Sequence, residues 1–148
     1  MKTVETRFGT FDAAEHDVIQ IPGGVPAFEA CTRFVLVSGP DIQPFNCLQG
    51  LDAPAPSFLV LDPRLVAPDY RPALSAMDLR RLDATATDTL LFLAIVHIGT
   101  GDDATVNLRA PIVVNPRRMM AVQVLPHESP YRHDHPLRLE AANAGLHP

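Results

Sequence analysis

The sequence is poor in features that would each point to a class of protein: long apolar runs, excess basic charge and cysteine. Its 148 residues hold 12 Lys and Arg against 17 Asp and Glu, which gives a formal net charge of −5. Direct nucleic-acid binding needs a basic surface to neutralise phosphates, so this acidic chain argues against it. The apolar runs are far shorter than the ~20 residues that span a bilayer, so we expect no membrane association. The charged start, residues 1–7, lacks the apolar core of a signal peptide, which predicts a cytoplasmic protein.

Cysteine and the common enzyme motifs are also scarce. The two cysteines, Cys31 and Cys47, have no C-x-x-C spacing and stand beside apolar residues, so they predict small buried side chains and not a zinc site. There is no Gly-x-Ser-x-Gly elbow, no phosphate-binding loop and no dinucleotide fingerprint. A Gly-Gly pair precedes Val25-Pro26, which favours a tight turn over a phosphate cradle. We therefore expect a protein that is not an enzyme and holds no cofactor.

The chain is rich in proline and in short β-type segments. A length of 148 residues with 47% hydrophobic and 20% charged residues suits one domain with a sizeable core. The 15 prolines are spread along the chain, so they punctuate strands and do not form a linker. Alternating or apolar runs predict strands at 4–8, 18–21, 34–37, 57–61, 89–98, 104–108, 111–115 and 119–125.

These segments predict one architecture. The most apolar run, 89–98, predicts a central strand buried on both faces, and the turn-rich stretch 99–103 joins it to a returning strand. The stretch from Ser75 to Leu82 begins with a Ser-x-x-Asp capping arrangement and predicts a short helix. The fold expected is mostly β: a small antiparallel β-barrel-like single domain with one short helix, over residues 1–137, followed by a flexible C-terminal tail at 138–148.

Histidines are the best candidates for metal chemistry. His127, His133 and His135 include a His-x-His pair, and imidazole binds transition metals well. They lie in a Pro-rich stretch, so we expect incidental metal affinity and no functional metal site. His97 stands in the most apolar run, which predicts a hydrogen-bonded core histidine. Two rival interpretations stay open: a small-ligand or flavin-binding β-barrel protein, and a metal-dependent hydrolase built on the three C-terminal histidines.

Several segments, in one order along the chain, resemble the FliW family of flagellar assembly factors. They are Phe8-Gly9; Val18-Ile19-x-Ile21-Pro22-x-Gly24-Val25-Pro26-x-Phe28-Glu29; Pro44-Phe45 with Leu48-Gln49-x-x-Asp52; and Thr105-Val106-Asn107-Leu108-x-Ala110-Pro111-Ile112-Val113-Val114-Asn115. The resemblance covers roughly residues 2–137, and several motifs in order are more specific than any one of them. This chain departs from the family's pattern: Ala27 stands where the family usually has Gly, and Gly50 stands where it has Ser. Because Ala adopts positive φ poorly, the exchange at Ala27 predicts a reshaped first turn.

The resemblance implies a binding protein with a β-barrel-like fold. Members of the FliW family bind flagellin in the cytoplasm, and many bind the translational regulator CsrA, whose basic surface represses flagellin mRNA. Flagellin and CsrA trade places on FliW, so secretion of flagellin frees FliW to relieve the repression. The expected partners of this chain are therefore flagellin and a CsrA-type regulator, bound in a mutually exclusive way. The net charge of −5 suits a basic partner.

The resemblance also places a protein-binding site around the Pro-Gly turn. The residues proposed for it are Gly24, Val25, Pro26, Phe28, Glu29, Asp52 and Asn107. An apolar ring beside a carboxylate on a loop is typical of an interface anchor. The alternative is that Phe28 plugs the end of the barrel while the glycines only turn the chain. For Asn107, capping a turn is the favoured role.

Overall fold

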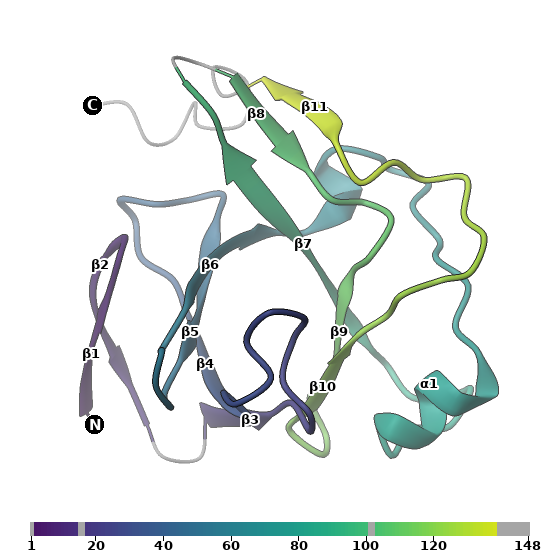
Figure 1. The fold of residues 1–148 in the computed structure, drawn as a ribbon, viewed down its shortest axis with the longest axis horizontal. Coiled ribbons are helices and arrows are strands. Elements are labelled where there is room, and N and C mark those ends of the chain that lie inside the picture. The colour runs from purple at the N-terminus through teal and green to yellow at the C-terminus, as the bar shows by residue number, and fades with distance from the viewer. Residues whose placement is uncertain (1, 15–16, 101–102, 139–148) are drawn as a thin grey trace.

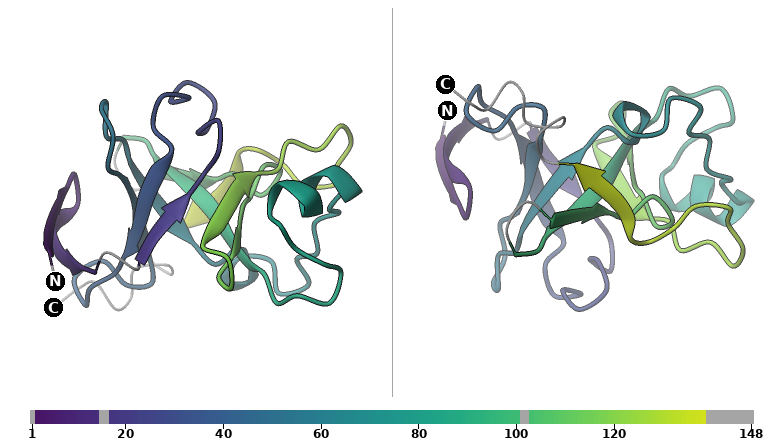
Figure 2. Two further views of the ribbon diagram at one scale, coloured as in Figure 1. Left: turned by 90° about the horizontal axis from the view of Figure 1, so that it is seen from below. Right: turned by 90° about the horizontal axis from the view of Figure 1, so that it is seen from above.

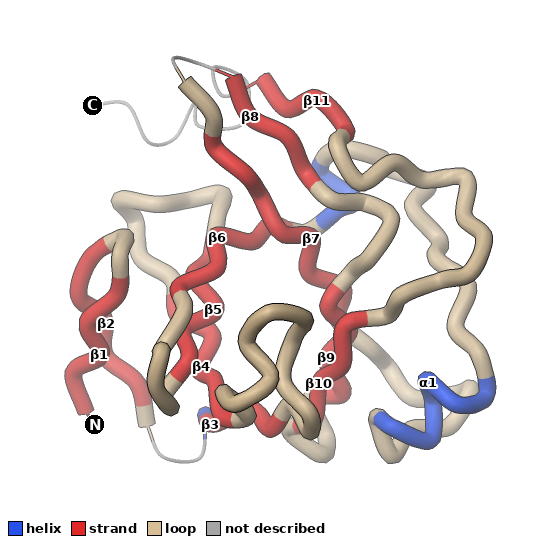
Figure 3. The backbone as a smooth tube through the Cα atoms, in the orientation of Figure 1, coloured by secondary structure: helices blue, strands red, loops and turns tan. Residues whose placement is uncertain are grey.

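The computed structural model describes residues 2–14, 17–100 and 103–138 (Figure 1). The strands are β1 (Lys2–Thr6), β2 (Gly9–Ala13), β3 (Val18–Gln20), β4 (Arg33–Val37), β5 (Asn46–Gly50), β6 (Ser57–Leu61), β7 (Leu91–Ile98), β8 (Asp103–Val106), β9 (Ile112–Asn115), β10 (Met120–Gln123) and β11 (His135–Arg138). The helices are the 3-10 turn η2 (Pro63–Leu65) and α1 (Ala76–Arg81). Strands dominate and α1 is short, as the sequence predicts (Figure 3).

The main sheet closes on itself. Its neighbours run β7-β6-β5-β4-β3-β10-β9, and β9 also pairs with β7, which completes a barrel of seven strands. The pairings are antiparallel except for one parallel contact between β3 and β10, at Gln20 and Met120. Strands β8 and β11 lie outside this ring as an extension of β7. The antiparallel barrel predicted from the sequence is thus confirmed, with that single parallel joint.

Strands β6 and β7 bury side chains on both faces, as predicted for the most apolar run. Val60 and Ile95 join the cluster to which every strand of the ring contributes, so this cluster fills the barrel interior. Leu61 and Ala94 alternate with them and join a second cluster on the outer face of the barrel. Burial on two faces removes any need for polar residues in these strands. The inside of the barrel is therefore packed with side chains.

Helix α1 begins where its sequence predicts. Ser75 accepts a hydrogen bond from the backbone N–H of Asp78 at 3.1 Å, and the Asp78 carboxylate accepts one from the Ser75 N–H at 2.9 Å. This capping box satisfies two of the free N–H groups of the first turn. The helix is tied to the barrel at its other end, because the buried Asn115 side chain donates to the carbonyl oxygens of Leu82 at 3.0 Å and of Asp83 at 3.3 Å.

The N-terminal segment differs from the single strand predicted at 4–8. Strand β1 ends at Thr6, Arg7 and Phe8 form a turn, and β2 returns antiparallel to β1. The Thr6 hydroxyl accepts from the Phe8 N–H at 3.0 Å and donates to the Gly9 carbonyl at 2.8 Å, so it supports the turn. The hairpin packs its apolar side chains on β4 and β5. Its two strands lie outside the barrel (Figure 2).

The last described strand extends one residue into the predicted tail. Arg138, which the sequence places in the tail, is the last residue of β11 and pairs with Asp103. The rest of the predicted tail, 139–148, falls outside the described residues, as do positions 101 and 102 of the predicted turn. The N–H of Gly99 donates to the carbonyl of Asp103 at 2.8 Å, so β7 does return into β8 as expected. Among the residues that the structure describes, no helix is long and apolar enough to cross a membrane.

Candidate binding surface

The loop between β3 and β4 carries most of the residues that the sequence singles out. It lies across one end of the barrel in Figure 1 and stands away from the strands in Figure 2. Three residues of the loop have positive φ: Gly23 at 78°, Gly24 at 65° and Ala27 at 76°. The N–H of Gly24 donates to Ile21 O at 2.8 Å, and that of Phe28 donates to Val25 O at 2.8 Å. The loop is thus a chain of tight turns whose shape depends on left-handed residues.

Ala27 keeps this turn without a glycine. Its φ of 76° lies in the left-handed region, where a Cβ costs about 1–2 kcal/mol. The Ala27 N–H donates to Oε2 of Glu29 at 2.6 Å, which helps to hold the strained residue. The position therefore does take a positive φ with alanine in place, and the carboxylate of Glu29 supports it.

The position of Phe28 is compatible with both interpretations that the sequence left open. Its ring is half-buried against the barrel interior and meets the Phe58 ring edge-on, with centroids 5.5 Å apart and planes at 83°. Phe34, fully buried, lies on the same Phe58 ring at 6.2 Å. Val25 is buried at the same end of the barrel, whereas Pro26 is exposed. Phe28 thus helps to close this end of the barrel, and part of the residue stays exposed to solvent.

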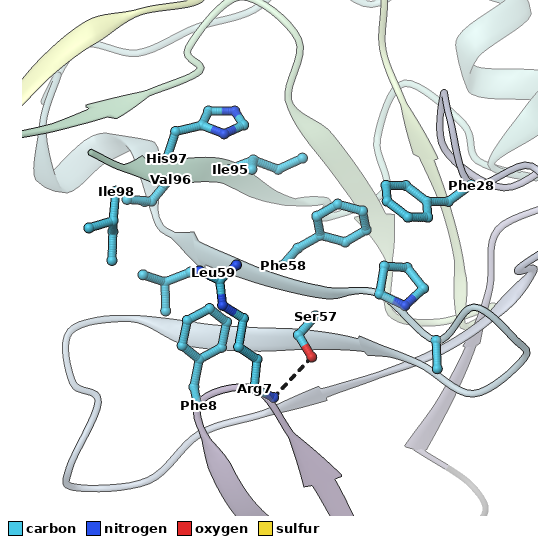
Figure 4. A pocket seen from close by; sticks show the side chains of 12 residues that line it. Arg7, Phe8, Phe28, Ser57, Phe58, Leu59, Ile95, Val96, His97 and Ile98 are labelled. Atoms are coloured by element: carbon cyan, nitrogen blue, oxygen red, sulfur yellow. Dashed lines mark hydrogen bonds between the residues drawn. The ribbon is translucent and has the colours of Figure 1, made fainter. Parts of the chain in front are cut away.

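A groove opens beside Phe28. It has a volume of about 520 Å³ and lies between β6, the end of β7, and the turn of the β1–β2 hairpin (Figure 4). Phe58 and Phe28 form one end of it, and Arg7 and Phe8 approach from the hairpin. The backbone N–H of Arg7 donates to the Ser57 hydroxyl at 3.1 Å, which fixes the hairpin turn at the groove. The groove is lined by aromatic and aliphatic side chains together with one guanidinium and one imidazole.

Asp52 supports the base of the β3–β4 loop. Its carboxylate accepts from the backbone N–H of Thr32 at 3.3 Å and of Arg33 at 3.2 Å. The Arg33 guanidinium donates two further bonds, from Nε at 3.1 Å and Nη2 at 2.8 Å. These side-chain hydrogen bonds lower the pKa of Asp52 below its usual value. The structure therefore joins Asp52 to the loop residues as a clamp at the foot of the loop.

Asn107 lies apart from the loop, in the connection between β8 and β9. Its side-chain oxygen accepts from the N–H groups of Arg109 at 3.1 Å and Ala110 at 3.0 Å. This is the turn cap that the sequence favours, because an Asn side chain commonly bonds the backbone two residues on. The structure does not bring Asn107 together with the other proposed site residues.

The histidines differ from their predicted places. His97 is exposed, so the prediction of a core histidine is wrong. It shares the lumen-facing side of β7 with Ile95, but it lies beyond Ile95, where the pairing of β7 with β6 ends. Within the described ranges, no three His, Cys, Asp or Glu side chains form a group that could hold a metal, and this includes His127, His133 and His135. Both cysteines are fully buried and unpaired, as predicted.

The groove itself is the part of the site that the sequence did not predict. Arg7, Phe58 and His97 come from the hairpin and two strands, and only the tertiary fold brings them together. The sequence of a strand that is apolar on both faces does not indicate at which residue its pairing with the neighbouring strand ends. The single local signal was the unusual polar residue, His97, at the end of the most apolar run.

These features define a class: a small closed β-barrel, filled inside, that offers a strained loop and an adjoining apolar groove on its outside. A family model described as FliW protein matches residues 2–137. The chain is 39% identical over 137 residues to the flagellar assembly factor FliW of Geotalea uraniireducens (strain Rf4), covering 92% of this chain and 83% of the relative. It is 35% identical over 145 residues to that of Geobacter sulfurreducens, covering 97% and 91%.

A solved structure agrees with the sequence comparison. The crystal structure of a flagellar assembly factor FliW superposes with a TM-score of 0.81 at 28% identity, over 91% of this chain and 96% of that chain. The chain belongs to the FliW family of flagellar assembly factors. The resemblance found in its motifs is thereby confirmed.

Proposed function

We propose that this chain acts in the cytoplasm by binding flagellin and, in a mutually exclusive way, a CsrA-type translational regulator. By this exchange it couples flagellin synthesis to flagellin secretion, and it does so by binding and not by catalysis. The observation that carries the proposal is the family match over residues 2–137 together with the shared barrel fold.

The surface supports a protein partner. The β3–β4 loop presents Pro26 and Glu29 to solvent while Val25 anchors it in the barrel. A loop held rigidly from below loses little entropy when it is bound. The net charge of −5 favours approach of a basic partner such as an RNA-binding regulator, since charge complementarity raises association rates. The packed barrel interior argues against the rival interpretation as a small-ligand or flavin-binding barrel.

The test uses the purified chain with flagellin and CsrA from its own organism. Size-exclusion chromatography with light scattering is expected to show a complex with each partner alone. Added in excess, flagellin is expected to displace the regulator from the chain. Co-elution with neither protein contradicts the proposal, and a stable ternary complex contradicts mutual exclusion. A flavin absorbance or stoichiometric ligand mass in the purified chain would instead favour the rival.

A pair of phenylalanine variants assigns the surface. Phe28→Ala removes the ring at the loop. Phe92→Ala removes another half-buried ring, which does not line the groove and meets the Tyr70 ring edge-on, with centroids 6.2 Å apart. Both are expected to lower stability by about 1–3 kcal/mol, less than a fully buried Phe. Only Phe28→Ala is expected to weaken partner binding. Equal binding by both variants contradicts a role of the loop in recognition.

A further inference from the structure

The groove marks a place where the main sheet splits. Strands β6 and β7 pair only through Val60 with Ile95 and Leu61 with Ala94. Beyond this point β6 continues with β5 as far as Ser57, and β7 continues with β8 as far as Ile98. The two strands therefore diverge, and the groove lies in the wedge between them (Figure 4).

The two walls of this wedge are strand edges. The N–H of Asn107 donates to Ile95 O at 2.9 Å, so the odd residues of β7 turn their backbone groups to β8. Because the backbone groups of successive residues point to opposite sides of a strand, the N–H and C=O groups of Val96 and Ile98 point toward β6. On β6, the same reasoning from the bond of Gly50 N–H to Pro56 O directs the backbone of Ser57 and Leu59 toward β7. The described residues place no backbone partner opposite Ser57 or Ile98.

Side chains line the wedge on both faces of the sheet. On the lumen side, Phe58, Ile95 and His97 surround it, because alternation along β6 and β7 points them that way. On the outer side lie Leu59 and Ile98, and Ile98 is 53% exposed. An added strand would send its side chains alternately to these two apolar faces. A compact ligand would use only one of them.

The one full charge in the lining of the wedge is positive. Arg7 and His97 are its only ionisable lining groups, in a chain whose net charge is −5. The Arg7 guanidinium lies over the Phe8 ring at 5.5 Å, and no carboxylate within the described ranges forms an ion pair with it. A partner that is apolar and carries a carboxylate complements this lining.

We propose that the wedge between β6 and β7 is a docking site for an extended segment of another polypeptide, which adds as a short strand, places apolar side chains on both faces and sets a carboxylate beside Arg7. Strand addition to a free sheet edge is a recurring mode of peptide recognition, in which backbone hydrogen bonds supply affinity and side-chain contacts supply specificity. The site does not require the partner to be flagellin, so it can hold or fail independently of the function proposed above.

The test uses the full chain, labelled with nitrogen-15, and a capped peptide of sequence Thr-Val-Val-Asp-Val-Thr as probe. Titration is expected to shift the amide resonances of residues 57–59 and 96–98 in a saturable way. A probe N-methylated on alternate amides cannot donate to the strand edges, and it is expected to bind about tenfold more weakly. A probe with Lys in place of Asp is expected to lose a similar factor. No saturable binding, or equal binding of the N-methylated or the Lys probe, overturns the proposal.

Two arginine variants test the charge. Arg7→Met keeps the aliphatic stem and is expected to weaken the Asp probe up to about fivefold. The Lys probe is expected to bind no more weakly to this variant, because the substitution removes a like charge. Arg64→Met is the matched control, because Arg64 also lies over a ring, that of Phe92, at 5.5 Å. Equal effects of the two variants overturn the role of Arg7.

Two other occupants would also overturn the proposal. A dimer in sedimentation experiments that the probe dissociates assigns the wedge to a second copy. A gain in probe affinity on deleting residues 139–148 assigns it to the chain's own tail.

Discussion

The structure predicts a large difference between two neighbouring glycines. Gly23 and Gly24 both have positive φ, so alanine at either position costs about 1–2 kcal/mol in backbone strain. A Cβ on Gly23 meets nothing within 4 Å, whereas one on Gly24 stands 2.5 Å from Phe28 O, 2.8 Å from Glu29 Cα and 2.9 Å from Cys31 O. All these neighbours are backbone atoms, which cannot rotate away. Gly24→Ala must therefore move the loop.

The size of the effect follows from these contacts. Overpacking of this kind adds about 1–3 kcal/mol, so Gly24→Ala is expected to lower the free energy of unfolding by about 2–5 kcal/mol. Gly23→Ala is the matched control, with an expected loss of about 1–2 kcal/mol from backbone strain alone. Urea unfolding followed by circular dichroism measures both values. Equal losses for the two variants would refute the account of the loop as a strained, tightly packed turn.

Three further predictions concern stability. Ala27→Gly relieves left-handed strain in the folded chain but adds conformational freedom to the unfolded chain. The free energy of unfolding is therefore expected to change by between 0 and about +1 kcal/mol. A clear decrease of this free energy in urea unfolding would contradict strain at Ala27. Asn115→Ala removes one buried and one partly buried hydrogen bond at the end of α1 and is expected to cost about 1–3 kcal/mol, with faster amide exchange in the helix. Unchanged exchange in the helix would argue against this tie. Asp52→Asn is expected to lower the melting temperature near neutral pH. Because the hydrogen bonds from Arg33 lower the pKa of Asp52 in the folded state, its stabilisation is present above the unfolded pKa of about 3.9 and is lost as pH falls through the folded value. The difference in melting temperature between Asp52→Asn and the unchanged chain is therefore expected to vanish below about pH 4. A difference that stays constant down to about pH 2 would contradict this.

Local signals predicted the elements that depend on neighbouring residues. The capping box of Ser75 and Asp78 is a contact between residues three apart, so the sequence contains all of it. The apolar run that became β7 was equally plain. Strand β5 was missed because its Asn46 and Gln49 interrupt the apolar pattern; in the structure Gln49 is buried and bonds the backbone of Gly50 and Ala55.

The candidate site was predictable only where one segment forms it. The turn between β3 and β4 was predicted from its glycines and prolines, because turn chemistry is local, and the resemblance to the FliW family marked it as a binding site. The groove joins Arg7 of the hairpin to His97 of β7, residues 90 positions apart in sequence, and its existence depends on where β6 and β7 separate. Hydrophobic pattern cannot locate that point, since both strands are apolar on either side of it.

The measurement that tests the central idea most directly is amide hydrogen exchange of the chain with and without flagellin from its own organism. If the chain works by docking its outer surface onto another polypeptide, flagellin will slow exchange in the β3–β4 loop and in the strand ends that line the groove, and will leave α1 unchanged. Protection confined to α1 and β11, or no protection at saturating flagellin, would contradict it.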